Sequence, residues 1–174
     1  MEIKICPDDL SKLELKDIHN LLIEAFEQDF SAEDWQHTFG GTRVIGLIEN
    51  KVVAHAAIVP RRIWLDDIEH QVGYLEGVAV LPQFQRRGVG SALLDYLSEF
   101  ASKNYQWSML SSGEKYFYRK HGWQDFLGQS FVLIADKEIA TPTEDEGLMY
   151  LAMGKHQRPS PKRAVCEQRS GDYW

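Results

Sequence analysis

Apolar residues recur at helical spacing near the start of the chain. One helical face is shared by five of them, Leu15, Ile18, Leu22, Ala25 and Phe26. This period predicts an amphipathic helix. The segment SAED then predicts a second short helix, with Ser31 as its N-cap and Asp34 as the capping-box partner. Asp34 therefore has a structural explanation before any functional one.

The middle of the chain has the pattern of strands. Residues 41–65 predict a hairpin that turns at Glu49–Lys51, and the apolar run from Val72 to Leu81 predicts a third strand. After Pro82 the period changes, and residues 88–104 carry the broad apolar stripe of an amphipathic helix.

The rest of the chain returns to strands. Residues 107–112 predict a short buried strand, and residues 113–123 predict a helix that ends at Gly122. Further apolar runs lie at 131–135, 147–153 and 164–168. The basic segment 155–163, with two prolines, predicts a surface loop between strands. This order predicts a single α/β domain over residues 1–174, with a mixed sheet around a central strand–loop–helix.

Composition is that of an ordinary globular protein. Of the 174 residues, 44% are hydrophobic and 26% are charged, a normal balance for one domain. No apolar run approaches the roughly 18 residues of a membrane span. The opening MEIKICPDD has no apolar signal region, so we expect a cytoplasmic protein without membrane contact. The two cysteines and six histidines lack ligand spacing, and we expect neither a disulfide nor a metal.

The net charge of −7 argues against a nucleic-acid partner, because nucleic-acid binding requires a basic patch. The charge suits a cationic partner, since acidic clefts concentrate cations. Solubility alone also explains an acidic surface, so both interpretations stay open.

The stretch GYLEGVAVLPQFQRRGVGSALL, residues 73–94, joins an apolar strand to a helix through a loop with glycines. Such a loop directs backbone N–H groups and the positive helix end at one place, which suits a pyrophosphate group. Arg86 or Arg87 would add positive charge. A Walker loop is excluded because GxxxxGK[ST] is absent, and GVGSAL lacks the third glycine of a dinucleotide-binding fingerprint.

The sequence QRRGVG matches the Q/R-x-x-G-x-G/A pattern of the GCN5-related N-acetyltransferases (GNAT). The chain also resembles this family in SSGEKYFYRKHGW, where a helical tyrosine precedes a Gly-aromatic pair. The blocks YLEGVAV, AHAAIVPRR, EQDFSAEDWQHTFGG, TPTEDEG and GDYW narrow the resemblance to the aminoglycoside 2′-N-acetyltransferases. The resemblance implies the GNAT fold, a mixed and mostly antiparallel central sheet flanked by helices, with acetyl-CoA bound at the central strand–loop–helix.

The resemblance also implies which residues hold acetyl-CoA. The backbone of Val78, Ala79 and Val80 would pair with the pantetheine arm like an added strand. The pyrophosphate would be bound by the loop and helix start, Gln85, Arg86, Arg87, Gly88, Val89, Gly90 and Ser91.

Acetyl transfer to an amine requires that the amine lose a proton, that the thioester oxygen be stabilised and that the departing thiolate be protonated. The resemblance implies Glu76 as the base, acting through water, beside Gly77 where a bulge would open the strand. It implies the Val78 N–H for the thioester oxygen, and Tyr118 rather than Tyr116 as the acid. A strand-face acid and a core tyrosine are the structural alternatives for Glu76 and Tyr118.

An aminoglycoside carries several ammonium groups, so its site would be lined by carboxylates and carbonyls. The resemblance implies eight substrate-binding residues: Asp29, Asp34, Gly77, Ser111, Asp145, Glu146, Asp172 and Trp174. Within TPTEDEG the register leaves Asp145 and Glu146 as alternatives. In the terminal SGDYW, we expect the Trp174 indole to anchor the tail, with Asp172 and the α-carboxylate facing the drug.

Four departures from the family concern the substrate. The segment between Ser112 and Tyr118 is a residue or two shorter than in the family, and TPTEDEG is one residue longer. Glu167 and Gln168 stand where the family has an aspartate and an aromatic residue, and the loop 155–163 has no counterpart. These differences keep a second hypothesis open, an acetyltransferase for another amine, such as an atypical aminocyclitol like kasugamycin, a polyamine or a protein N-terminus. A third hypothesis is a non-catalytic coenzyme-A-binding module, against which the presence of Glu76 and Tyr118 counts. Family habit implies a homodimer.

Overall fold

The computed structural model of the chain describes residues 1–6, 12–27, 29–152 and 159–174. Its contacts define two compact units, which are described separately. Unit 1 comprises Met1–Val59 and Leu75–Phe100, and unit 2 comprises Pro60–Tyr74 and Ala101–Trp174. The expected loop 155–163 lies partly outside the described residues, and the single-domain assignment stays a prediction. Within the described part of the chain, no helix is long and apolar enough to cross a membrane.

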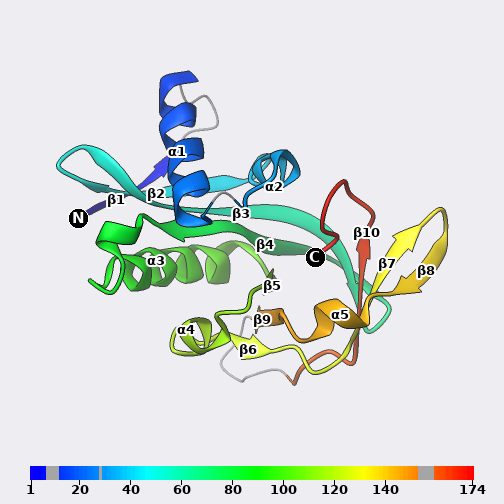
Figure 1. Cartoon of the computed structure of the whole chain (residues 1–174). Coiled ribbons are helices and arrows are strands. Elements are labelled where there is room, and N and C mark those ends of the chain that lie inside the picture. The colour runs from blue at the N-terminus through cyan, green and yellow to red at the C-terminus, as the bar shows by residue number, and fades with distance from the viewer. Residues whose placement is uncertain (7–11, 28, 153–158) are drawn as a thin grey trace. The chain divides into compact units, whose positions relative to one another are not determined.

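Unit 1 combines antiparallel strands with helices (Figure 1). Its elements are β1 (Glu2–Cys6), α1 (Lys12–Ala25), α2 (Ala32–His37), β2 (Thr42–Ile48), the first part of β3 (Lys51–Leu65), the last part of β4 (Ile68–Val80), the 3-10 turn η1 (Pro82–Phe84) and most of α3 (Val89–Asn104). β2 pairs antiparallel with β1 and with β3. The apolar faces of α1 and α3 are buried, as Ile18 and Leu22 on α1 and Leu93 and Leu97 on α3 show.

Unit 2 holds the other parts of β3 and β4 and most of the later elements (Figure 1). These are β5 (Trp107–Ser111), α4 (Lys115–Arg119), β6 (Gln124–Asp125), β7 (Gln129–Ile134), β8 (Lys137–Ala140), α5 (Pro142–Asp145), β9 (Leu148–Ala152) and β10 (Arg163–Glu167). The strand order is β6-β9-β5-β4-β3-β10-β7-β8. The β4–β5 and β10–β7 pairs are parallel, whereas β5–β9, β6–β9, β7–β8 and β10–β3 are antiparallel. The predicted mixed, mostly antiparallel sheet is therefore confirmed.

The core of unit 2 includes the end of the chain. Strand residues such as Ile63, Tyr74, Met109 and Leu148 form one buried cluster, and Trp174 belongs to the same cluster with only 4% of its surface exposed. Full burial of one such side chain contributes about 1.5–3 kcal/mol. The last residue is therefore part of the core of unit 2.

Two-residue turns join the strands of three hairpins, β2–β3, β3–β4 and β7–β8. The turn at Glu49–Asn50 was expected from the sequence, and the same geometry recurs at Asp66–Asp67 and at Ala135–Asp136, where both residues have positive φ. Such turns match the right-handed twist of the strands they join. The second residue of each turn is Asn or Asp, which tolerates this conformation.

Most predicted elements are confirmed, with shifts at their ends. The predicted helix over 113–123 forms only at Lys115–Arg119, while Gly122 has the left-handed φ of +86° expected for a residue after a helix end. The third strand begins at Ile68 instead of Val72, because the Asp66–Asp67 turn starts a hairpin there. Among the described residues, five elements had no sequence prediction: β1, η1, β6, β8 and α5.

Candidate active site

The predicted anion-binding segment runs from the end of β4 to the start of α3 in unit 1 (Figure 1). Arg86 and Gly88 have φ values of +56° and +80°, so the backbone turns sharply at both. The side-chain amide of Gln85 donates a hydrogen bond of 3.0 Å to the Val80 carbonyl and ties the loop to the strand. Among the described residues, no heavy atom lies within 4 Å of a Cβ built on Gly88, so the loop backbone is open at this position.

The helix start adds hydrogen-bond donors to this loop. The first helical bond of α3 runs from the Ala92 N–H to the Gly88 carbonyl, at 3.0 Å. The N–H groups at 89–91 come before it and have no acceptor within the helix. The Arg87 guanidinium lies 6.0 Å from the centre of the Phe84 ring. Backbone donors, a helix dipole and two exposed arginines together fit a pyrophosphate group.

Beside Glu76, β4 departs from regular strand geometry. Gly77 has a φ of +57°, which side chains with a Cβ rarely adopt. A Cβ at this position would lie 3.0 Å from Thr38 Cγ2 and 3.3 Å from two atoms of the His55 ring. Both conformation and space therefore require glycine here. The structure thus shows a left-handed φ at Gly77, and the bulge expected beside Glu76 stays a prediction.

A buried polar pair supports this bend. His55 Nδ1 lies 2.7 Å from the Gly77 carbonyl oxygen, and Arg43 Nε donates to His55 Nε2 at 3.0 Å. Burial, together with the neighbouring Arg43 charge, lowers the pKa of His55 to about 3, although its bond to Gly77 opposes this shift. The imidazole is therefore neutral at physiological pH. Arg43 also donates to the carbonyl and hydroxyl of Thr38.

Two predicted substrate residues of unit 1 have defined local positions. The carboxylate of Asp34 accepts bonds from the Ser31 N–H and hydroxyl, which completes the predicted capping box of α2. Asp29 is exposed just after α1, where its own N–H bonds to the Phe26 carbonyl at 2.8 Å. The capping role of Asp34 is thus confirmed, and the substrate roles of Asp29 and Asp34 stay predictions.

In unit 2, Tyr118 lies on the short helix α4 and is 7% exposed. Burial raises the pKa of its phenol to about 12, although a hydrogen bond with Ser112 partly opposes the shift. The ring packs edge-to-face against Phe117 and Trp123. By contrast, Tyr116 on the same helix is 69% exposed. A buried phenol with one side-chain hydrogen bond is kept protonated and oriented.

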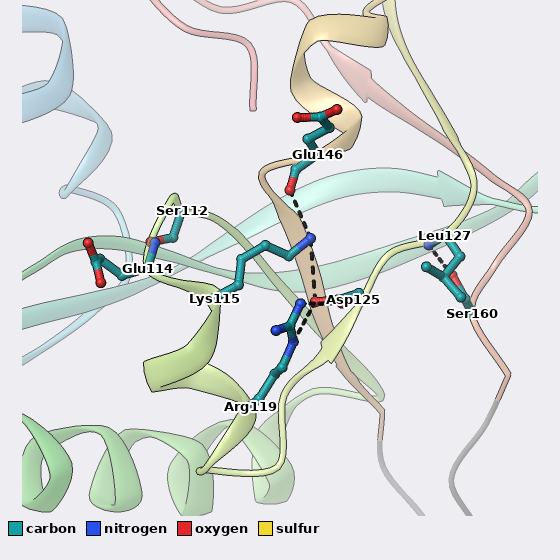
Figure 2. Close-up of polar contacts among 8 residues, drawn as sticks. All are labelled: Ser112, Glu114, Lys115, Arg119, Asp125, Leu127, Glu146 and Ser160. Carbon is teal, nitrogen blue, oxygen red and sulfur yellow. Dashed lines mark hydrogen bonds and ion pairs between the residues drawn. The ribbon is translucent and has the colours of Figure 1, made fainter.

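Three charged residues fasten α4 in place (Figure 2). Arg119 forms a forked bond to Asp125 on β6, with distances of 3.2 and 2.6 Å. Lys115 lies 3.4 Å from the same carboxylate and donates to the Glu146 backbone carbonyl at 2.8 Å. Figure 2 shows the Glu146 carboxylate pointing away from Lys115. These contacts hold the helix that carries Tyr118 against the segment that follows α5.

The chain end is held by its backbone and its indole. The Tyr173 carbonyl accepts a bond of 2.6 Å from Arg61, and the Trp174 indole N–H donates to the Thr141 hydroxyl at 3.0 Å. Arg169 donates to the Asp172 carbonyl at 2.6 Å. The tail is therefore docked, as expected for the Trp174 indole.

The acids of α5 do not share one role. Asp145 Oδ1 accepts bonds from both the N–H and the hydroxyl of the buried Ser130, at 2.7 and 2.6 Å. The pKa of Glu144 is raised by burial, and further by the nearby carboxylates of Asp172 and Asp145. A carboxylate held close to like charges gains most from a cationic partner. Glu144, which is not among the predicted substrate residues, thus has two carboxylates as neighbours, whereas the Asp145 carboxylate is bound to Ser130.

We expect Asp145→Ala to lower the melting temperature by about 3–10 °C, because it leaves the buried Ser130 N–H without its acceptor at a cost of about 1–3 kcal/mol, whereas the Ser130 hydroxyl can still donate to the Thr141 carbonyl at 2.9 Å. Glu146→Ala removes a neighbouring carboxylate that points away from Lys115 and should change the melting temperature by less than about 2 °C. Calorimetry of both variants checks this. Equal melting temperatures for the two would show that the Ser130 contacts carry no stability.

Ser111, the last residue of β5, lies opposite Leu148 on β9. A Cβ on Gly147 would approach the Ser111 hydroxyl to 2.7 Å. Ser111 is exposed, unlike the four buried residues of β5 before it, and Gly147 has no room for a side chain beside its hydroxyl.

His55, which contacts the bend at Gly77, and Arg43, which donates to His55, were not predicted from the sequence, although their positions in apolar strands indicate a buried polar contact. His55 interrupts the apolar run KVVAHAAIV, and Arg43 is the second residue of β2, the strand that pairs with it. A polar side chain inside a buried strand needs a hydrogen-bond partner, which is the clue that singles out His55.

Known proteins resemble the chain along most of its length. The acetyltransferase (GNAT) domain family matches residues 7–125. An aminoglycoside 2′-N-acetyltransferase of Mycolicibacterium fortuitum is 32% identical over 171 residues, which cover 95% of this chain and 88% of that protein.

Solved structures agree in fold. A GNAT family N-acetyltransferase (YhbS) from Escherichia coli, in complex with CoA, has a TM-score of 0.66 at 16% identity and covers 95% of this chain and 88% of that one. A probable N-acyltransferase from Enterococcus faecalis has a TM-score of 0.61 at 21% identity over 74% of this chain. The match spans only 33% of that larger protein.

Proposed function

Because the chain belongs to the GCN5-related N-acetyltransferase family, we propose that it transfers the acetyl group of acetyl-CoA to the 2′-amine of an aminoglycoside. The observation that carries this proposal is the 32% identity to an aminoglycoside 2′-N-acetyltransferase along 95% of the chain. Acetylation removes a positive charge from the drug. Since cationic groups supply affinity for RNA phosphates, the product would bind RNA less tightly, and the cell would be resistant.

The strand–loop–helix of unit 1 suits the coenzyme. The N–H groups at 89–91 and the side chains of Arg86 and Arg87 would bind the pyrophosphate, while the backbone of Val78–Val80 pairs with the pantetheine arm. The coenzyme supplies an acyl group on a good thiolate leaving group. The E. coli structure that contains CoA has the same fold.

The residue roles follow the order of bond changes. Glu76 takes a proton from the substrate ammonium through a water molecule, and the freed amine attacks the thioester carbon. The Val78 N–H donates to the thioester oxygen as its negative charge develops. As the C–S bond breaks, the Tyr118 hydroxyl gives its proton to sulfur and the nitrogen loses its second proton to solvent, and the phenolate then regains a proton from solvent. Each assignment rests on the sequence resemblance and on the local surroundings of that residue.

The cationic substrate requires negative partners. In unit 2 these are Glu144, Asp172 and the α-carboxylate of Trp174, and Asp29 and Asp34 belong to unit 1. Carboxylates near one another bind multiply charged cations more strongly than a single acid does. Within unit 2 we assign substrate binding to Glu144, Asp172, Ser111 and the Trp174 α-carboxylate, and within unit 1, separately, to Asp29, Asp34 and Gly77. Asp145 instead holds Ser130, and the substrate role of Glu146 stays a prediction.

The test is thiol release from acetyl-CoA with a matched pair of aminoglycosides that differ only in an amino or a hydroxyl group at C2′. Turnover with the amino compound alone, and mass spectrometry that places the acetyl group at N2′, supports the proposal. Turnover with spermidine, peptides or kasugamycin in place of both drugs assigns another amine as substrate. Coenzyme binding without turnover on any amine assigns a non-catalytic module. A homodimer stays a prediction, which light scattering tests.

The docked tail gives a separate prediction. Adding one glycine after Trp174 moves the α-carboxylate but keeps the indole, and we expect KM for the aminoglycoside to rise about two- to fivefold while KM for acetyl-CoA stays unchanged. Deleting Trp174 instead removes a core side chain and should lower the melting temperature by about 10 °C. Steady-state kinetics and calorimetry separate the two effects. If the added glycine leaves KM for the aminoglycoside unchanged, the tail contributes only to packing.

A further inference from the structure

We propose that His55, held by Arg43, is a positioning residue for acetyl transfer, because it fixes the plane of the Gly77–Val78 peptide and thereby the direction of the Val78 N–H. This inference rests on the proposed function, which assigns the developing thioester oxygen to that N–H. All the residues that carry the inference belong to unit 1.

The register of β2 and β3 brings the two side chains together. Arg43 lies opposite Ala57, and Ile45 lies opposite His55. Residues two apart on a strand share a face, so Arg43 and His55 are diagonal neighbours. His55 is fully buried and Arg43 is 7% exposed. The Arg43 guanidinium also lies 4.7 Å from the centre of the Phe39 ring, which restricts its movement further.

The three hydrogen-bonding groups allow one arrangement of protons. The Gly77 carbonyl can only accept, so the 2.7 Å contact requires a proton on His55 Nδ1. The Arg43 Nε–H can only donate, so the 3.0 Å contact requires a lone pair on His55 Nε2. A single neutral tautomer satisfies both, and burial beside a cation keeps the ring neutral. The direction of the whole chain of bonds is therefore determined.

The planar Gly77–Val78 peptide links the hydrogen bond at its C=O to the direction of its N–H. The peptide is planar and trans, so its C=O and N–H point to opposite sides. Because the Gly77 carbonyl points at His55, the Val78 N–H of the same peptide points away from the Arg43–His55 pair. The φ of +57° at Gly77 is what turns the peptide out of the regular strand pattern.

The pair is better explained by orientation than by stability. Desolvating a guanidinium and an imidazole is costly, and a buried polar pair adds little net stability over apolar side chains. What the pair supplies is a fixed hydrogen-bond direction. Oxyanion donors act through such fixed orientation, because they do not have to reorganise during the reaction.

The test compares two His55 variants of similar shape. His55→Leu removes the donor to Gly77, whereas His55→Asn keeps an amide N–H near the position of Nδ1. We expect the Leu variant to lose about tenfold or more in kcat, with KM for acetyl-CoA within about threefold of wild type. The Asn variant should recover most of that loss. Val44→Ala is the control, since Val44 is fully buried next to Arg43 on β2 but its side chain lies on the opposite face.

A wild-type kcat in His55→Leu, or an equal loss in Val44→Ala measured below both melting temperatures, overturns the positioning role. A second measurement does not depend on activity. Long-range ¹H–¹⁵N correlation spectra of the wild-type imidazole should show the Nδ1–H tautomer at pH 7, and the Val78 amide resonance should move in His55→Leu but not in Val44→Ala. An Nε2–H tautomer or an unmoved Val78 amide overturns the inference. If wild type releases no thiol with any amine, the proposed function fails, and the spectra still decide whether His55 orients this peptide.

Discussion

Replacing Glu76 with glutamine is expected to lower kcat/KM for the aminoglycoside by about 10²–10⁴-fold, the range that a positioned general base contributes. The substrate amine reaches the enzyme as an ammonium ion, which has no lone pair for attack. Glutamine keeps the shape of the side chain but cannot take up a proton. The change therefore removes the chemistry and leaves the strand geometry beside Gly77 in place.

The defect of the Glu76→Gln variant should shrink as the pH rises. At higher pH a growing fraction of the substrate amine is already neutral in solution, so the missing base matters less. Thiol release measured from pH 6 to pH 9 should show the wild-type and variant rates converging. Glu69→Gln is the matched control, because it removes an exposed carboxylate from the same strand, β4, and should keep kcat/KM within about twofold. A variant with more than half of the wild-type rate at pH 6 would exclude Glu76 as the base.

The parts of the fold that could be predicted have strong local signals. The capping box at Ser31 and Asp34 is predicted by four consecutive residues, SAED, and forms as expected. The apolar stripe of α3 repeats over four turns, and the turn at Glu49–Asn50 separates two apolar strands. In each case the information lies within a few residues of the chain, so no distant contact is needed to read it.

The missed elements have no such signal. β8 is four residues long and exposed at each position, and β6 has only two residues. Each is a strand because a neighbour pairs with it: β7 with β8, and β9 with β6. Pairing across the sheet is a tertiary property, and neither alternation nor composition reveals it over so short a length.

The candidate site divides in the same way. The loop Gln85–Gly90 could be found because its glycines and arginines are adjacent in the sequence. The contact of His55 with Gly77 joins residues 22 positions apart and depends on the register of three strands. Likewise, the difference between Glu144 and Asp145 depends on Ser130, which lies on another element. Adjacent acids in a sequence are therefore not interchangeable once the chain has folded.

Replacing Tyr118 with phenylalanine is the second change with a large expected effect, a fall of about 10²-fold in kcat with little change in KM for acetyl-CoA. The ring keeps its packing against Phe117 and Trp123, and only the hydroxyl is lost. Tyr116→Phe removes a hydroxyl from an exposed ring two residues earlier on α4 and should keep kcat within about twofold. Steady-state thiol release at saturating amine measures both variants. Wild-type kcat in Tyr118→Phe would remove this residue from the reaction.

The dependence of kcat on pH tests whether Tyr118 acts as an acid. An acid must be protonated to act, and burial raises the pKa of Tyr118 to about 12, so kcat of the wild type should show no alkaline limb from this group below about pH 11. A free thiol ionises near 8.5, so complete transfer from the phenol to a relaxed thiolate is uphill. We predict that Tyr118 donates as the C–S bond breaks, and not afterwards.

Ser112 allows this timing to be tested. Its hydrogen bond to the Tyr118 hydroxyl opposes the rise in the phenol pKa, because it stabilises the phenolate that forms as the proton leaves. We expect Ser112→Ala to lower kcat about three- to tenfold, in proportion to one lost hydrogen bond to a charged oxygen in the transition state. In the Tyr118→Phe background the same substitution should have no further effect, since the phenolate it stabilises cannot form. Additive losses in the double variant would mean that Ser112 acts on a group other than Tyr118.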